Sequence, residues 1–236
     1  MIDTRRRPEP GADAVRSGMD VPLEPAPCNS SACSIRPTCA VSLQSLGLRF
    51  EHRSLSVFRQ FDEFSRINPV VKAPTLVCND GTVLMDSTLI LDYAEAMATG
   101  GRSLMPRDLA GRRLALRRIG LSLAACEKAV QIVYEHHLRP AEKLHQPWVD
   151  RVTGQLEAAF AALEADLGTR PIAADSSALD QGDVSVAVAW AFTQAMLPGV
   201  VSIERHPNLH AFSALAESLP EFRAAPHGDS TYHAPD

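Results

Sequence analysis

The spacing of apolar and polar residues divides this chain into two parts, with a change of pattern near residue 100. In the first part, short helical and strand-like patterns alternate. Helices are predicted near residues 41–47, 58–68 and 87–97, and strands near 48–53, 75–78 and 82–85. An Asn-Asp-Gly turn that ends at Gly81 separates the last two strands and predicts a hairpin. This order of elements is typical of an α/β domain.

The second part has the pattern of long helices packed in a bundle. Apolar residues recur at steps of three and four over residues 116–137 and again over 149–167. In the first of these helices the recurring residues form a stripe along one side, which is expected to face the core. The stripe consists of Leu116, Ile119, Leu123, Cys126, Val130, Val133 and His137. The segment after Asp183 is apolar on nearly all sides, so we expect a buried central helix started by an Asp180–Asp183 capping box. One last amphipathic helix is predicted over 206–222.

Composition and charge exclude several classes of protein. The 236 residues are 45 % hydrophobic and 22 % charged, and the net charge of −5 gives no electrostatic reason to expect nucleic-acid binding. We found neither a run of apolar residues long enough to span a membrane nor a secretory signal, so we expect a cytoplasmic protein without a membrane partner. Five cysteines, an odd number without framework spacing, indicate reduced thiols.

These patterns predict an α/β domain followed by an all-α domain. We expect a disordered or atypical, proline-rich N-terminal extension over residues 1–31, which has no apolar period. The α/β domain is then expected over 32–99 and a turn-rich linker over 100–108. The all-helical domain then covers 109–225 and a tail covers 226–236.

One segment carries a recognisable series of motifs. Residues 68–96, NPVVKAPTLVCNDGTVLMDSTLILDYAEA, contain a Lys-x-Pro step before a strand, an Asp-Gly hairpin and an acid-Ser pair, in that order. This series resembles the glutathione-binding domain of cytosolic, bacterial-type glutathione S-transferases, and the likeness extends over roughly residues 40–225. The resemblance implies a thioredoxin-like domain, a helical-bundle domain and a homodimer. It also implies an enzyme that conjugates the thiolate of glutathione to a small electrophile.

The resemblance further implies which residues bind glutathione, the cosubstrate. In this family the bond before the matching proline, Pro74, is cis, which turns the Ala73 backbone toward the cysteinyl part of the ligand. Lys72 is similar to the family's lysine that helps to hold the glycine end of the glutathione tripeptide. Asp86 and Ser87 open a helix, where free N–H groups and the helix dipole attract an anion. The γ-glutamyl carboxylate is then expected at Ser87 and the α-ammonium at Asp86.

The start of the chain departs from the family pattern. The family places a Ser, Tyr or Cys at the first turn of its first helix, where that side chain stabilises the glutathione thiolate; here Cys33 and Ser34 are the candidates. The preceding MDVPLEPAPCNSS holds three prolines and is a poor central strand. Two interpretations are open: a diverged N-terminus in which Cys33 or Ser34 makes the contact, or a shifted reading frame or wrong start before about Cys39.

Three functions follow from these alternatives. The first is conjugation of glutathione to a small electrophile. The second is a non-catalytic glutathione-binding or scaffold protein, which keeps Lys72, Ala73, Pro74, Asp86 and Ser87 but lacks the thiolate-stabilising residue. In the third, a Cys33 thiolate forms a mixed disulfide with glutathione and the protein acts as a thiol transferase. No histidine or cysteine spacing in the chain indicates a metal site.

Overall fold

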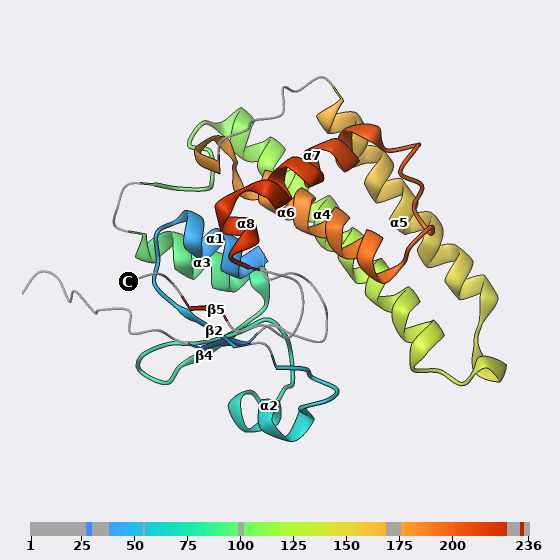
Figure 1. The fold of residues 1–236 in the computed structure, drawn as a ribbon, viewed down its shortest axis with the longest axis horizontal. Coiled ribbons are helices and arrows are strands. Elements are labelled where there is room, and N and C mark those ends of the chain that lie inside the picture. Colours follow the sequence, from blue (N-terminus) through green and yellow to red (C-terminus); the bar gives the residue numbers. More distant parts are fainter. Residues whose placement is uncertain are drawn as a thin grey trace, which may run out of the picture.

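A computed structural model describes residues 27–29, 38–53, 55–98, 102–168, 176–225 and 232–233, and shows a sheet domain beside a helical domain (Figure 1). The sheet domain contains β1 (Pro27–Asn29), α1 (Thr38–Ser45), β2 (Glu51–Arg53), α2 (Phe61–Ile67), β3 (Thr75–Val77), β4 (Val83–Met85) and α3 (Ser87–Met97). The rest comprises α4 (Leu109–His137), η1 (Ala141–Lys143), α5 (Gln146–Leu167), η2 (Ser176–Ala178), α6 (Gln181–Met196), α7 (Pro207–Ser218), α8 (Pro220–Arg223) and β5 (Tyr232–His233).

The five strands form one mixed sheet in the order β4-β3-β1-β2-β5. β1 pairs with β2 in parallel and with β3 antiparallel, and β5 adds to the outer edge of β2. Helices α1 and α3 lie on the face of the sheet toward the helical domain, and α2 lies on the opposite side (Figure 1). This is the thioredoxin-like arrangement that the sequence predicted, followed by the predicted helical domain.

The central strand lies where we expected none. β1 consists of Pro27–Asn29, inside the segment 1–31 that was expected to lie outside the α/β domain. The physical reason is composition, because Pro22, Pro25 and Pro27 stand in or just before this strand and no run of strand-forming residues surrounds it. Its proline occupies the first position of the strand, which a strand tolerates. The prolines of this segment therefore gave a misleading signal, and the expected boundary at residue 32 comes too late for this strand.

The end of α1 follows the sequence closely. Gly47 has a φ of +72°, a conformation that glycine adopts without penalty. The Gly47 N–H donates to the Gln44 carbonyl at 2.8 Å, and the Leu48 N–H donates to the Leu43 carbonyl at 2.9 Å. These two bonds form a Schellman motif, which ends the helix and turns the chain toward β2. The predicted glycine stop is thus confirmed.

The predicted hairpin is also confirmed. β3 and β4 pair antiparallel, with Thr75 opposite Met85 and Val77 opposite Val83. Gly81 lies in the connecting turn with a φ of +84°. The hairpin brings the chain before β3 and the chain after β4 to the same end of the sheet, which matters for the site described below.

Helix α6 is the buried centre of the helical domain, as predicted. The Asp183 N–H donates to Asp180 Oδ1 at 2.9 Å, and the Asp180 N–H donates to Asp183 Oδ2 at 3.2 Å, so the expected capping box is present. Asp183 also forms an ion pair with Arg118 of α4 at 3.0 Å, and both side chains are only 1 % exposed. The start of α6 is therefore fixed to α4 by a buried charge pair. None of the helices described is long and apolar enough to cross a bilayer.

The last predicted helix is divided in two. Pro220 begins α8 directly after α7, because proline lacks the N–H that would continue the preceding helix. The start of α7 has no cap from its own N-cap side chain, His206. Instead, Glu164 of α5 accepts hydrogen bonds from the N–H groups of Asn208 and Leu209 at 2.9 and 2.8 Å. α7 is thus capped by a residue about 40 positions earlier in the chain.

Candidate functional site

The loop before β3 holds three of the residues predicted to bind glutathione. The peptide bond between Ala73 and Pro74 is cis, as the resemblance implied. The Lys72 carbonyl accepts hydrogen bonds from the Thr75 hydroxyl at 2.6 Å and from the Asn68 side-chain amide at 3.4 Å. Asn68 itself is buried, while the Lys72 side chain is exposed. The backbone of the loop is thus fixed, and the lysine is accessible to a ligand.

The chain after β4 brings two further predicted residues to the same place. Because Thr75 is paired with Met85, the next residues along the two strands are Pro74 and Asp86, so these lie at the same end of the hairpin. Asp86 caps α3, since its Oδ1 accepts the N–H of the second helical residue at 3.0 Å. Its φ of +73° is a conformation that residues other than glycine rarely adopt. Ser87 is the first residue of α3.

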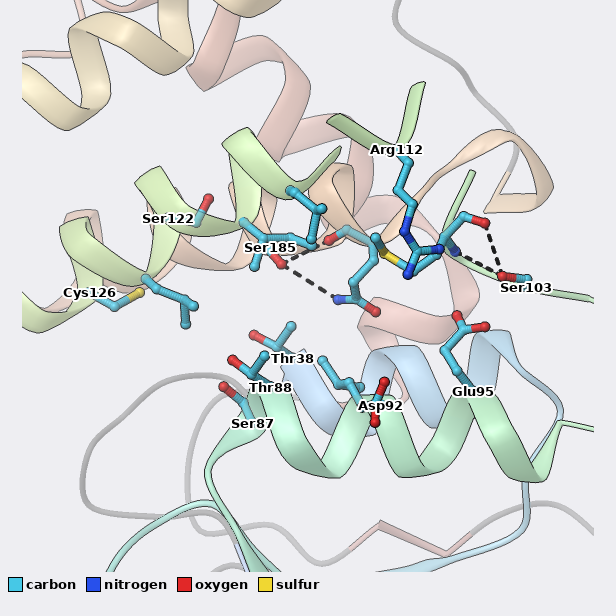
Figure 2. Close-up of a pocket in the computed structure, with 16 residues that line it drawn as sticks. Thr38, Ser87, Thr88, Asp92, Glu95, Ser103, Arg112, Ser122, Cys126 and Ser185 are labelled. Carbon is cyan, nitrogen blue, oxygen red and sulfur yellow. Dashed lines mark hydrogen bonds between the residues drawn. The ribbon is translucent and has the colours of Figure 1, made fainter. Parts of the chain in front are cut away.

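A cavity of about 240 Å³ begins at this helix start and lies between α3 and the helical domain (Figure 2). Residues from α1, α3, the linker, α4 and α6 line it: Thr38, Ser87, Thr88, Leu91, Asp92, Glu95, Ser103, Met105, Arg112, Leu116, Ile119, Ser122, Leu123, Cys126, Gln181 and Ser185. Ser87 therefore belongs both to the predicted glutathione site and to the wall of this cavity.

The cavity explains an error in the sequence interpretation of α4. The stripe containing Leu116, Ile119 and Leu123 was expected to face the core, but Leu116 is 53 % and Leu123 is 40 % exposed. These side chains form the α4 wall of the cavity instead. The core-facing positions of α4 carry mostly small or polar residues: Ala115, Arg118, Ser122, Ala125, Cys126, Ala129, Ile132 and Glu135. α5 and α6 pack against that face. The first half of the predicted stripe therefore lines the cavity, whereas Cys126, Val130 and Val133 of its second half are buried in or packed against the core, as predicted.

The linker fixes the position of α3 relative to the helical domain. The Leu104 N–H donates to Glu95 Oε1 at 2.7 Å, and the Leu104 carbonyl accepts the Gln181 N–H at 2.8 Å. Leu104 itself is buried. One linker residue therefore joins the last turns of α3 to the first residue of α6, across the width of the cavity.

Several residues of the cavity were missed by sequence reasoning. Thr38 opens α1, Asp92 lies on α3, and Arg112 lies in the first turns of α4. Charged residues on a predicted helix are ordinarily assigned to a solvated face, and no spacing signal relates helices so far apart in sequence. Cys33 and Ser34, the two predicted catalytic residues, lie outside the described residues.

Two of the cysteines differ in their burial. Cys126 is buried, whereas Cys78, which follows β3, is half-buried. Burial raises the pKa of the Cys78 thiol; a hydrogen bond with Tyr93 lowers it, and the nearby Asp80 carboxylate raises it further. Because the thiolate is the reactive form, Cys78 should be less reactive at neutral pH than an ordinary cysteine.

We expect the rate of Cys78 alkylation by iodoacetamide to reach half of its maximum at a higher pH than that of a free cysteine. Peptide mass spectrometry across a pH series measures this rate at Cys78 separately from the other cysteines. Replacing Asp80 by Asn removes the nearby negative charge, so it should move the midpoint back toward the ordinary value. A wild-type midpoint at or below that of free cysteine would contradict the expected direction.

Comparison with known families matches a segment in each of the two domains. The model of the glutathione S-transferase N-terminal domain matches residues 28–101, and the model of the glutathione S-transferase C-terminal domain matches residues 146–215. Together the two segments cover more than half of the chain. Comparison with curated protein sequences found no match.

Solved structures of bacterial proteins share the fold. A glutathione S-transferase from Methylobacterium radiotolerans, in complex with glutathione sulfonate, aligns with a TM-score of 0.77 and 23 % identity, over 88 % of this chain and 97 % of that one. A glutathione transferase family member from Pseudomonas fluorescens with bound glutathione aligns with a TM-score of 0.72 and 26 % identity, over 86 % of this chain and 99 % of that one.

Three features define a protein of the glutathione-transferase class. They are a thioredoxin-like sheet with a cis proline before β3, a helix α3 that begins with an acid-Ser pair, and a helical domain that follows. The chain belongs to the glutathione S-transferase family.

Proposed function

We propose that this protein binds glutathione and transfers its thiolate to a small electrophile. The observation that carries the proposal is the start of α3, where Asp86 lies at the same end of the hairpin as Pro74 and the next residue, Ser87, lines the cavity. A helix start offers free N–H groups and a positive dipole end to a carboxylate. The α-ammonium of a γ-glutamyl group then meets the Asp86 carboxylate, while Ser87 donates to its carboxylate.

Three further observations support this proposal. The unusual φ of +73° at Asp86 is the kind of backbone strain that clusters at ligand sites. The Pseudomonas fluorescens relative, 26 % identical, was crystallised with bound glutathione. Lys72 directly precedes Ala73 and its side chain is exposed, so it would be available to the glycine carboxylate of the tripeptide. Conjugation further requires a donor that stabilises the thiolate, and Cys33 and Ser34 are our candidates for that role.

Retention on glutathione-agarose tests the binding step. Ser87→Ala removes one hydrogen bond to a charged group and should weaken glutathione binding by roughly tenfold or more. Asp86→Asn keeps a side chain that caps a helix well but removes the charge, so it should weaken binding while leaving stability nearly unchanged. The matched control is Ser218→Ala at the exposed end of α7, which should bind as the wild type does. Absence of retention by the folded wild-type protein would refute the proposal.

Activity assays separate the three functions. Conjugation of chlorodinitrobenzene supports a transferase, and disulfide reduction that is lost in Cys33→Ser supports a thiol transferase. Retention on glutathione-agarose without either activity supports a non-catalytic binding protein. Ser34→Ala, measured beside Cys33→Ser, shows which of the two predicted residues the activity needs.

We also propose that the protein is a homodimer that associates through α3 and α4. Large apolar side chains are exposed on both helices, including Leu89 at 63 %, Tyr93 at 39 % and Leu114 at 40 %. Exposed apolar residues gathered on neighbouring elements are typical of interaction surfaces.

Light scattering should give twice the mass of one chain for the wild type, and Leu89→Glu should shift the mass toward the monomer. Ile203→Glu, on an exposed residue before α7, is the control that should stay dimeric. A monomeric wild type would contradict the proposal.

A further inference from the structure

The loop between α2 and β3 contains a valine with an unusual backbone conformation. Val71 has a φ of +52°, which lies in the left-handed region that glycine and asparagine adopt far more readily than a β-branched residue. Backbone strain of this kind persists only where the surroundings impose it, and it clusters at ligand sites. Val71 directly precedes Lys72 and Ala73, so its conformation sets the course of the chain into the proposed glutathione site.

A buried asparagine imposes this conformation. Asn68 is 1 % exposed and is the C-cap residue of α2. Its backbone carbonyl accepts the Val71 N–H at 2.9 Å, and its side-chain oxygen accepts the Val70 N–H at 3.0 Å. Its side-chain amide donates to the Thr75 hydroxyl at 2.9 Å and lies 3.9 Å from Met85 Sδ. One side chain thus connects the loop to both strands of the hairpin that frames the site.

The loop has a relaxed alternative in which the site is not assembled. Residues 69–72 lie at the surface, where Val71 is half-buried and the other three are exposed. A return of Val71 to an ordinary negative φ would turn the following backbone through more than about 100°. That change would displace Lys72 and Ala73 relative to Asp86. Surface loops open locally at a small part of the free energy of global unfolding, so the fold does not have to unfold for this exchange.

We propose that Val71 is a positioning residue that limits the affinity of the protein for glutathione. Its left-handed conformation, which Asn68 imposes, arranges Lys72 and Ala73 for the tripeptide. The cost of that conformation keeps part of the unliganded protein in the relaxed form, and a ligand that binds only the assembled form then has a raised apparent dissociation constant. This inference rests on the proposed function, because its ligand is the glutathione of that site.

Isothermal titration calorimetry with glutathione tests the proposal on the full-length protein. Val71→Asn and Val71→Gly should each lower the dissociation constant by roughly three- to tenfold, because both residues adopt the left-handed conformation readily. The two replacements have no side-chain group in common, so a shared gain reports the backbone. Val70→Asn is the matched control, since Val70 is the neighbouring valine, is 67 % exposed and has an ordinary φ. Its affinity should stay within about twofold of the wild type.

A rescue experiment tests the part played by Asn68. Asn68→Ala removes the side-chain bonds to the loop and should weaken glutathione binding. Adding Val71→Asn should recover part of the loss, because it favours the left-handed conformation without the help of Asn68. A merely structural effect of Asn68→Ala would not be rescued by a change at Val71. Circular dichroism shows whether each variant is folded, and the two single Val71 variants decide the proposal even if Asn68→Ala does not fold.

Equal or weaker binding by both Val71 variants would overturn the proposal. That holds even if their urea midpoints rise, since the strain would then lower the stability of the fold without limiting binding. Glutathione binding by the wild type without a gain in either variant refutes this inference alone. Absence of binding by the folded wild type and by both variants refutes the proposed function, and this inference with it.

Discussion

Replacing Arg118 by Met is expected to lower the free energy of unfolding by about 3–5 kcal/mol, the usual cost of leaving one buried charge without its partner. Arg118 Nη1 lies 3.0 Å from Asp183 Oδ1, and its other terminal nitrogen donates to the Asp166 backbone carbonyl at 3.3 Å. Without the guanidinium, the buried Asp183 carboxylate loses its counter-charge at the start of α6. Urea denaturation followed by circular dichroism measures the loss.

The neighbouring arginine provides a matched control. Arg117 Nε lies 2.9 Å from Asp166 Oδ2, but Arg117 is 53 % exposed. An exposed pair contributes about 0–1 kcal/mol, so Arg117→Met should change stability little. The two variants differ by one position on the same helix and remove the same chemical group. Equal effects of the two substitutions would show that burial of the Arg118 pair is not what stabilises this contact.

Replacing Gly182 by Val is expected to destabilise the protein by about 1–3 kcal/mol, because the side chain has no room. A Cβ atom at Gly182 would lie 3.0 Å from both the Cα and the carbonyl oxygen of Ala115. These are backbone atoms of α4, so they cannot rotate away, and α4 and α6 would have to separate. The cost should appear as a lower urea midpoint.

Gly120 is the control for Gly182, since it lies in the middle of α4 with nothing within 4 Å of an added Cβ. Gly120→Ala should stabilise the protein by roughly 0.5–1 kcal/mol, because alanine favours the helix more than glycine does. The two glycine substitutions are therefore expected to have opposite signs. Stabilisation by Gly182→Val would contradict the close approach of the two helices.

Local patterns predicted the elements of this fold better than their packing. The glycine stop at Gly47, the hairpin at Gly81 and the Asp180–Asp183 capping box depend on a few adjacent residues, and all three are confirmed. The first half of the α4 stripe was assigned to the wrong surroundings, because periodicity shows that a helix has an apolar side without showing what covers that side. β1 was missed because it lies among prolines, without a run of strand-forming residues around it.

The candidate site shows the same difference between what local motifs predict and what packing decides. Asp86 and Ser87 could be identified because they follow a hairpin within one continuous motif, and their neighbour Pro74 comes before the same hairpin. Thr38 and Arg112 could not, because their meeting at one cavity depends on how α1, α3 and α4 pack. Propensity and spacing carry no information about that packing.

The cap that Glu164 provides for α7 has a consequence for the order in which the helical domain forms. An isolated α7 would leave its first N–H groups without protein partners, because His206 supplies no side-chain cap. In an isolated helix those groups would bond to water, and the protein partner for them is Glu164, which bonds to both Asn208 and Leu209 once α5 is in place. During synthesis α5 precedes α7, so a partner is ready when α7 appears. The helix that closes this domain is therefore expected to form by docking and not on its own.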